Sequence, residues 1–167
     1  MSQAETVGAL DGAVGYVLKQ AAAALRGAMD AALRPLQLTV PQYACLELLG
    51  QRPGLSNADL ARGAFVSRQS MNGVLRGLQD RGLLTRPATA VQGRALPTEL
   101  TPLGRHQLQA ASAAVRTVQQ RMLSALPSEH RHRLLDDLAR CAAALSHGTP
   151  PADPASPGQA RQPVRPG

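Results

Sequence analysis

Apolar residues recur in steps of three and four along several parts of the chain, the spacing that places them on one face of an α-helix. The first of these stretches predicts a long helix over residues 11–34, ended by Pro35. A second helix follows Thr39, a favourable N-cap residue, and a Pro-Gly turn at residues 53–54 ends it. The N-terminal third of the chain is therefore predicted to be helical.

The middle of the chain predicts two shorter helices joined by a tight turn and followed by a hairpin. The first helix covers residues 57–63 and is capped by Ser56, whereas Ser67 caps the second and Gly82 stops it. The apolar face of the second helix comprises Met71, Val74, Leu75 and Leu78. Two short strands are predicted within residues 83–100. This order of elements is that of a winged helix-turn-helix.

Two further helices are predicted after the hairpin. Thr101 and Pro102 begin the first, in which apolar residues repeat as a heptad: Leu108, Ala111, Val115, Val118 and Met122. Such a stripe packs either on its own domain or against a second copy of the same helix. Ser128 caps the last helix, whose apolar face carries Leu134, Leu138, Cys141 and Leu145.

The charge of the chain indicates a polyanionic partner. The formal net charge is +7 and the sequence pI is about 10.9, values typical of proteins that bind nucleic acid or an anionic membrane surface. Seven arginines against three acidic residues lie between residues 57 and 105, so much of the excess falls on the predicted helix-turn-helix. A localised basic footprint fits contact with DNA phosphates better than a uniformly basic membrane binder. No apolar run of membrane-spanning length and no signal peptide is found, which predicts a cytoplasmic protein.

The polar face of the second predicted helix carries side chains suited to reading DNA. Arginine addresses guanine O6 and N7 together, glutamine and asparagine address adenine N6 and N7, and serine serves base or phosphate. The helix N-terminus adds unpaired N–H groups that favour a phosphate. An ordinary solvated helix face is the alternative, but its place in a helix-turn-helix favours DNA. The polar residues are Ser67, Arg68, Gln69, Ser70, Asn72 and Arg76.

The sequence gives no basis for an enzyme, a metal site or a cofactor. Cys45 and Cys141 lack metal-ligand spacing and are predicted to be buried free thiols inside helices. His130 and His132 are two residues apart, so they do not share a helical face, and further ligands are not evident. We therefore expect a binding protein.

Three segments together resemble the MarR family of bacterial winged-helix regulators. They are "LTVPQYACLELL", "LSNADLARGAFVSRQSMNGVLRGLQDRGLLTRP" and "GRALPTELTPLGR", and the resemblance covers roughly residues 11–147. It implies a homodimer whose second helix-turn-helix element enters a major groove of double-stranded DNA while the wing contacts the minor groove. It also implies a small-molecule effector that binds between the dimer helices and the winged domain.

The resemblance assigns roles to particular residues. DNA-binding roles carry over to Asn57, Ser67, Arg68, Gln69, Ser70, Asn72, Arg76 and Arg94. Together with the apolar stripes, it predicts a dimer interface formed by Val14, Val17, Leu108, Val115, Val118, Met122, Leu138 and Leu145. A peroxide-sensing branch of the family uses a cysteine in the first helix, where this chain has none.

The predicted fold is mainly α, with a two- or three-stranded β-wing and terminal dimerisation helices. The predicted organisation is a flexible N-terminus (1–10), one domain (11–147) with dimerisation helices at 11–36 and 102–147 and a winged helix-turn-helix at 39–101, and a disordered Pro/Gly-rich tail (148–167). We predict a ligand-responsive repressor that binds an inverted repeat as a homodimer. The alternative is a degenerate winged-helix interaction module. It is motivated by Gly73 and by a wing with Gln92 where the family commonly has an acid.

Overall fold

The computed structural model describes residues 12–86 and 98–146, which fold mainly as helices. The elements in chain order are α1 (Val14–Leu33), the 3-10 helix η2 (Arg34–Leu36), α2 (Val40–Gln51), α3 (Asn57–Gly63), α4 (Arg68–Asp80), β1 (Leu84–Thr85), β2 (Glu99–Leu100), α5 (Pro102–Leu123) and α6 (Ser128–Ser146). The predicted mainly α fold with a small wing is confirmed. The chain divides into two compact units after residue 125, inside the range for which one domain was predicted. The predicted N-terminal segment and Pro/Gly-rich tail lie outside the described residues.

Local capping determines where the helices begin. The Thr39 hydroxyl accepts from the N–H of Gln42 at 3.3 Å, and the Gln42 side chain accepts from the N–H of Thr39 at 3.0 Å, so a capping box starts α2. Thr101 similarly accepts from the N–H of Gly104 at 3.0 Å at the start of α5. Two predicted helix boundaries differ slightly from those in the structure. Pro35 lies inside η2, since its fixed φ suits a helical turn, and Ser128 is the first residue of α6.

A left-handed glycine ends α4, as the sequence predicts. Gly82 has φ +69°, a conformation that costs glycine little because it has no Cβ. Its N–H donates to the carbonyl of Gln79 at 2.9 Å, and the N–H of Leu83 donates to the carbonyl of Leu78 at 3.0 Å. These two bonds form a Schellman motif, which directs the chain from α4 into the wing.

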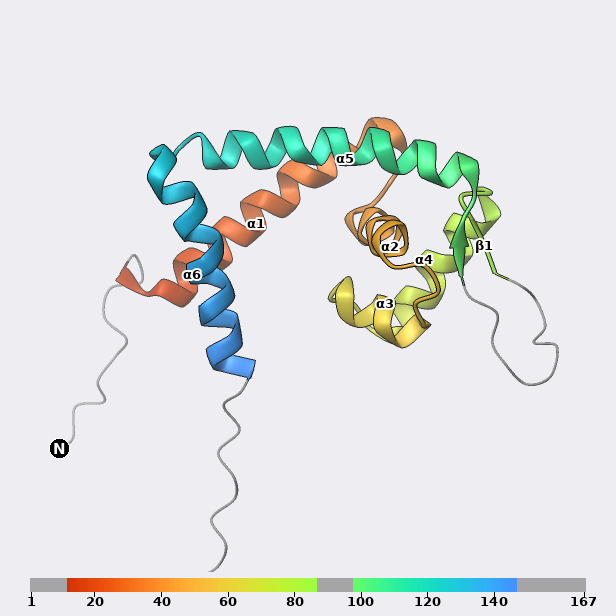
Figure 1. Ribbon diagram of the computed structural model, residues 1–167, viewed down its shortest axis with the longest axis horizontal. Helices are drawn as coiled ribbons and strands as arrows, with labels where there is room; N and C mark the ends of the chain where they lie inside the picture. Colours follow the sequence, from red (N-terminus) through yellow and green to blue (C-terminus); the bar gives the residue numbers. More distant parts are fainter. Residues whose placement is uncertain (1–11, 87–97, 147–167) are drawn as a thin grey trace, which may run out of the picture. The chain divides into compact units, whose positions relative to one another are not determined.

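The core of the first unit lies around α2, which packs against both α4 and α5, and α1 packs along α5 (Figure 1). Each element contributes fully buried side chains, among them Leu33, Leu46, Leu60, Leu75 and Ala111. Leu108, Val115 and Val118 from the heptad stripe also lie in or against the chain's own packed interior. For these three residues the structure therefore favours intrachain packing over a contact with a second copy.

The wing is a two-stranded antiparallel sheet at the base of α5. Leu84 pairs with Leu100 and both are buried, while Thr85 and Glu99 are exposed. A Cβ on Gly104 would lie 1.9 Å from the carbonyl oxygen of Leu83, so only glycine allows this close approach of α5 to the wing. Residues 87–97, including Arg94, lie outside the described residues, so the predicted contact of Arg94 with the minor groove stays a prediction.

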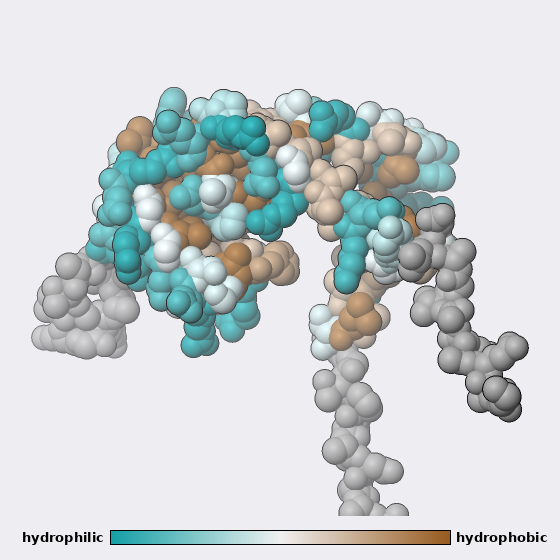
Figure 2. Space-filling view, turned by 180° about the vertical axis from the view of Figure 1, so that it is seen from behind, coloured by the Kyte–Doolittle hydropathy of each residue, from teal (hydrophilic) through white to brown (hydrophobic). Residues whose placement is uncertain are grey.

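In the second unit, α6 exposes its apolar side chains. Leu135 is 73% exposed and Leu145 is 85% exposed, and no residue of α6 is buried. Figure 2 shows a brown apolar patch at the end of α6. Among the residues described, no helix is long and apolar enough to cross a membrane.

Candidate nucleic-acid interface

α4 separates its apolar and polar residues onto opposite faces. Met71, Leu75 and Leu78 are at most 1% exposed and anchor the helix to the core. The predicted reading residues Ser67, Arg68, Gln69, Ser70, Asn72 and Arg76 are all exposed. The structure thus places the polar residues together on the solvent-facing side of one helix, as the spacing predicts.

The N-terminus of α4 is held by the side chain that caps it. The Ser67 hydroxyl accepts from the N–H of Ser70 at 3.0 Å and lies 3.0 Å from the Ser70 hydroxyl, to which it can donate. This cap satisfies one of the free N–H groups at the helix start and leaves Arg68 and Gln69 directed into solvent. The remaining N–H groups face the side from which a phosphate can approach.

Asn57 positions Asn72. The Asn57 amide nitrogen donates to the Asn72 side-chain oxygen at 2.6 Å, which links the start of α3 to the middle of α4. The side-chain oxygen of Asn57 is buried and has no hydrogen-bond partner among the described residues. Asn57 therefore orients Asn72 from behind, and Asn72 is the more exposed of the two.

The helix preceding α4 is stabilised by its own cap. Asp59 accepts hydrogen bonds from the hydroxyl and N–H of Ser56, at 2.5 and 3.4 Å, and forms an ion pair with Arg62. The Ser56 hydroxyl, together with Arg62, holds the pKa of Asp59 below its ordinary value. Arg62 thus has a partner within α3.

The arginines of this region differ in how they are used. Arg81 donates to the carbonyl oxygens of Gln37 at 2.6 Å and Leu36 at 3.4 Å, so it fastens the end of α4 to η2. By contrast, the side chains of Arg68 and Arg76 form no ion pair or hydrogen bond with another described residue, and both are exposed. The basic footprint on α4 therefore reduces to these two side chains.

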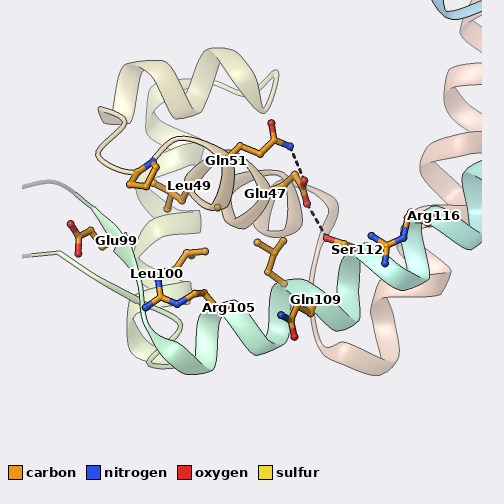
Figure 3. A pocket seen from close by; sticks show the side chains of 12 residues that line it. Glu47, Leu49, Gln51, Glu99, Leu100, Arg105, Gln109, Ser112 and Arg116 are labelled. Carbon is orange, nitrogen blue, oxygen red and sulfur yellow. Dashed lines mark hydrogen bonds between the residues drawn. The ribbon is translucent and has the colours of Figure 1, made fainter.

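A cavity of about 580 Å³ lies between α2, α5 and β2 (Figure 3). Leu49, Leu100 and Leu108 supply apolar wall, and Arg105 and Arg116 lie towards opposite ends of the α5 segment that lines it. The eleven-residue separation of the two arginines corresponds to about 16 Å along the helix. Neither arginine forms an ion pair within the described part of the chain. The cavity thus combines apolar walls with two cationic groups and the carboxylates of Glu47 and Glu99.

Glu47 is the centre of a hydrogen-bond cluster beside this cavity. Its carboxylate accepts from Ser112 at 2.9 Å, from Gln51 at 2.7 Å and from the Tyr43 hydroxyl at 3.2 Å. Partial burial raises the pKa of Glu47, but these three donors and the charge of Arg116 outweigh it and bring the pKa below its ordinary value. Burial, together with the Glu47 charge, raises the pKa of Tyr43.

The same cluster also borders a second cavity, of about 550 Å³, which Met29 of α1 helps to line. Glu47, Gln51, Ser112 and Arg116 contribute to the walls of both cavities. The Ser112–Glu47 hydrogen bond therefore connects α2 to α5 between the two cavities.

Comparison with known proteins decides the family. A sequence model described as MarR family matches residues 36–95. The HTH-type transcriptional repressor Rv2887 of Mycobacterium tuberculosis is 45% identical over 131 residues, which cover 77% of this chain and 94% of the repressor. The chain belongs to the MarR family.

Solved structures agree with this membership. The M. tuberculosis MarR family protein Rv2887 in complex with DNA matches with a TM-score of 0.66 and 41% identity, over 77% of this chain and 96% of that one. Its complex with p-aminosalicylic acid matches with a TM-score of 0.68 and 43% identity, over 77% and 98%. The relatives are thus transcriptional regulators with structures that contain DNA or an aromatic acid.

Several contacts of this MarR-family chain were not predicted from the sequence. The Arg81–η2 contact, the Ser112–Glu47 bond and the Asn57–Asn72 bond join residues that are 15 to 65 positions apart, so no local pattern indicates them. Phe65, in the turn before α4, is 95% exposed and was not selected as a site residue. A large aromatic side chain in a short turn between two helices was the one available signal.

Proposed function

We propose that this chain is a dimeric, effector-responsive transcriptional repressor that reads an inverted repeat in double-stranded DNA. The exposed polar face of α4 carries the proposal. Arg68 and Gln69 lie at the capped N-terminus of a helix whose opposite face is locked in the core, so they are presented rigidly. Arginine and glutamine are the side chains that recognise guanine and adenine in the major groove.

Dimerisation uses the apolar side chains that the single chain leaves exposed. Val14, Val17, Met122, Leu138 and Leu145 are 42 to 85% exposed, on α1, α5 and α6. Apolar residues on three helices that face water in the monomer favour burial against a second copy. Two copies of α4 related by a two-fold axis then meet half-sites about 34 Å apart.

The effector site that we propose is the cavity between α2 and α5. An aromatic carboxylate suits it, because Arg116 or Arg105 can pair with the carboxylate while Leu49, Leu100 and Leu108 cover the ring. The salicylic and p-aminosalicylic acid complexes of the Rv2887 protein support this class of ligand. A ligand that separates Ser112 from Glu47 changes how α2 sits against α5, and thereby the spacing of the two α4 helices.

Selection from a random duplex library tests the DNA-binding part. The chain is expected to enrich an inverted repeat and to bind it as a dimer, with an affinity that falls steeply as salt rises because counterions are released. Enrichment of no sequence, together with a flat salt dependence, would contradict DNA reading and favour the interaction-module alternative.

Salicylate titration tests the effector part. The Arg116→Gln variant is expected to bind salicylate about tenfold more weakly, as fits the loss of one charge-assisted hydrogen bond. Arg121→Gln is the matched control, because Arg121 lies on α5 but does not line either cavity. Equal salicylate affinity in wild type, Arg116→Gln and Arg105→Gln would place the effector elsewhere.

A further inference from the structure

Phe65 is the most exposed large apolar side chain in the described part of the chain. It is 95% exposed, whereas the other large apolar residues described in the winged module are buried or partly buried. A phenyl ring in water loses the favourable transfer free energy that burial would provide. An aromatic side chain at this position therefore contributes nothing visible to the fold of the single chain.

The backbone at Phe65 is also strained. Its φ of +55° lies in the left-handed region, where a Cβ crowds the following carbonyl oxygen. The N–H of Val66 donates to the carbonyl of Ala61 at 3.0 Å and the N–H of Phe65 to that of Arg62 at 3.2 Å, which places Phe65 at the C′ position of a Schellman motif. Glycine is the residue that suits this position.

Gly63 does not relieve this strain. It ends α3, but its role is close packing, since a Cβ there would lie 2.7 Å from a methyl carbon of Leu48. The turn thus has a glycine where space is short and a phenylalanine where glycine would fit the backbone better. Strained residues of this kind concentrate at functional sites.

Phe65 adjoins the reading end of α4. It precedes the N-cap Ser67 by two residues, which is at most about 7 Å along the chain. Arg68 and Gln69, both exposed, follow directly. The apolar group that DNA displays in the major groove is the C5 methyl of thymine, and phenylalanine is among the side chains that contact it.

We propose that Phe65 determines operator specificity by packing its ring against the C5 methyl group of a thymine in each half-site. The inference rests on the proposed function, since it requires a DNA-bound α4. The proposed dimer surface involves apolar residues on α1, α5 and α6, and Phe65 belongs to none of these helices. A contact with DNA thus accounts for the exposed ring, for the strain and for the place of the residue.

The Phe65→Gly variant tests the proposal on a duplex that the wild-type chain has selected from a random library. Glycine relieves the left-handed strain, so the melting temperature should rise by a few degrees. Affinity for the selected duplex should fall roughly tenfold, as fits the loss of a methyl-sized apolar contact in both half-sites. A more stable protein that binds DNA less well is not the result of damaged folding.

Gln37→Gly is the matched control. Gln37 is exposed and is the other non-glycine residue with positive φ among those described, at +54°, and it lies between η2 and α2. This variant should gain stability as Phe65→Gly does, yet bind the duplex as wild type does. Wild-type DNA affinity in Phe65→Gly would overturn the proposal.

Replacement of single thymines by uracil identifies the contact, because uracil lacks only the C5 methyl group. At one position in each half-site, uracil should weaken the wild type but leave Phe65→Gly unchanged, so that the two changes are not additive. Equal sensitivity of both proteins at every position would overturn the thymine contact.

Two other outcomes would also overturn the proposal. A Phe65→Gly protein that sediments as a monomer would show that the ring contacts the second copy of the chain instead of DNA. Failure of the wild type to select any duplex would overturn the proposed function itself.

Discussion

The exposed face of α4 and the contact between α2 and α5 are both polar, but their side chains are satisfied differently. At the α2–α5 contact, Tyr43, Gln51 and Ser112 all donate to Glu47. On α4, Arg68 and Arg76 have no partner among the described residues. Polar groups that satisfy one another fix the geometry of a protein, whereas those that remain free can bind a ligand. The comparison therefore separates the frame of the molecule, meaning the side chains whose mutual contacts fix the fold, from the exposed face of α4, which we propose reads DNA.

The largest expected effect is on the free energy of unfolding, which should respond very differently to substitutions on the two faces of α4. Met71→Ala removes a fully buried side chain and should lower the free energy of unfolding by about 2–5 kcal/mol. Gln69→Ala, two positions earlier on the exposed face, should change it by less than about 0.5 kcal/mol while weakening operator binding. Urea denaturation monitored by circular dichroism measures both values. Similar losses of stability in the two variants would show that the exposed face also supports the fold.

The arginines of α4 and its C-cap should differ in the same sense. Arg81→Ala leaves the carbonyl of Gln37 without its side-chain donor and that of Leu36 with Gln107 alone, and should lower the free energy of unfolding by about 1–3 kcal/mol. Arg76→Ala should leave stability nearly unchanged but reduce the salt dependence of DNA binding by about one phosphate contact. Chemical denaturation and salt titrations of both variants check this pair. A loss of stability in Arg76→Ala would show that Arg76 also supports the fold.

Acid should weaken the Glu47 cluster. Because the folded-state pKa of Glu47 is lowered, its stabilising contribution is present above the unfolded value of about 4.3 and disappears as the pH falls through the folded-state pKa. Glu47→Gln should therefore cost about 1 kcal/mol at pH 7, and the difference from wild type should shrink below about pH 4. Denaturation at several pH values checks this. Exposed Glu99→Gln is the control, and a pH-independent Glu47→Gln difference would contradict the account.

The two cysteines extend the comparison to reactivity, with the smallest expected effect on function. Burial raises the pKa of Cys45 to about 12, so its thiolate is scarce at neutral pH. The prediction of a buried thiol is wrong for Cys141, which is exposed because no residue of α6 is buried within the chain. Iodoacetamide at pH 8 should modify Cys141 in the folded protein and leave Cys45 intact, as read by mass spectrometry. Rapid modification of Cys45 under native conditions would mean that α2 opens more readily than its packing indicates.

Much of the frame was predictable from sequence because it depends on neighbours in the chain. Ser56 and Ser67 cap their helices by accepting a hydrogen bond from the backbone N–H three residues later. Gly82 adopts the left-handed conformation that glycine favours. The two faces of α4 follow from helical periodicity alone. Interactions between neighbours in the chain therefore determined the position of the exposed polar face of α4 as well as the ends of the helices.

The remainder depends on contacts between distant parts of the chain. Ser112 and Glu47 are 65 residues apart, and Arg81 reaches carbonyls 44 and 45 residues away, so only the folded structure brings them together. The heptad in α5 was open to two interpretations, because periodicity does not say which surface covers a stripe. Phe65 opposes the local preference for glycine, so its left-handed turn was not predicted.

Operator discrimination by Arg68→Ala tests the central claim most directly. The ratio of affinities for the selected duplex and a scrambled duplex should fall relative to wild type, because a base contact is lost. The fall should correspond to about 1–3 kcal/mol of binding free energy. Arg133→Ala on α6 removes the same charge from an exposed site and should keep the wild-type ratio. If Arg68→Ala also keeps that ratio, the exposed face of α4 does not read DNA.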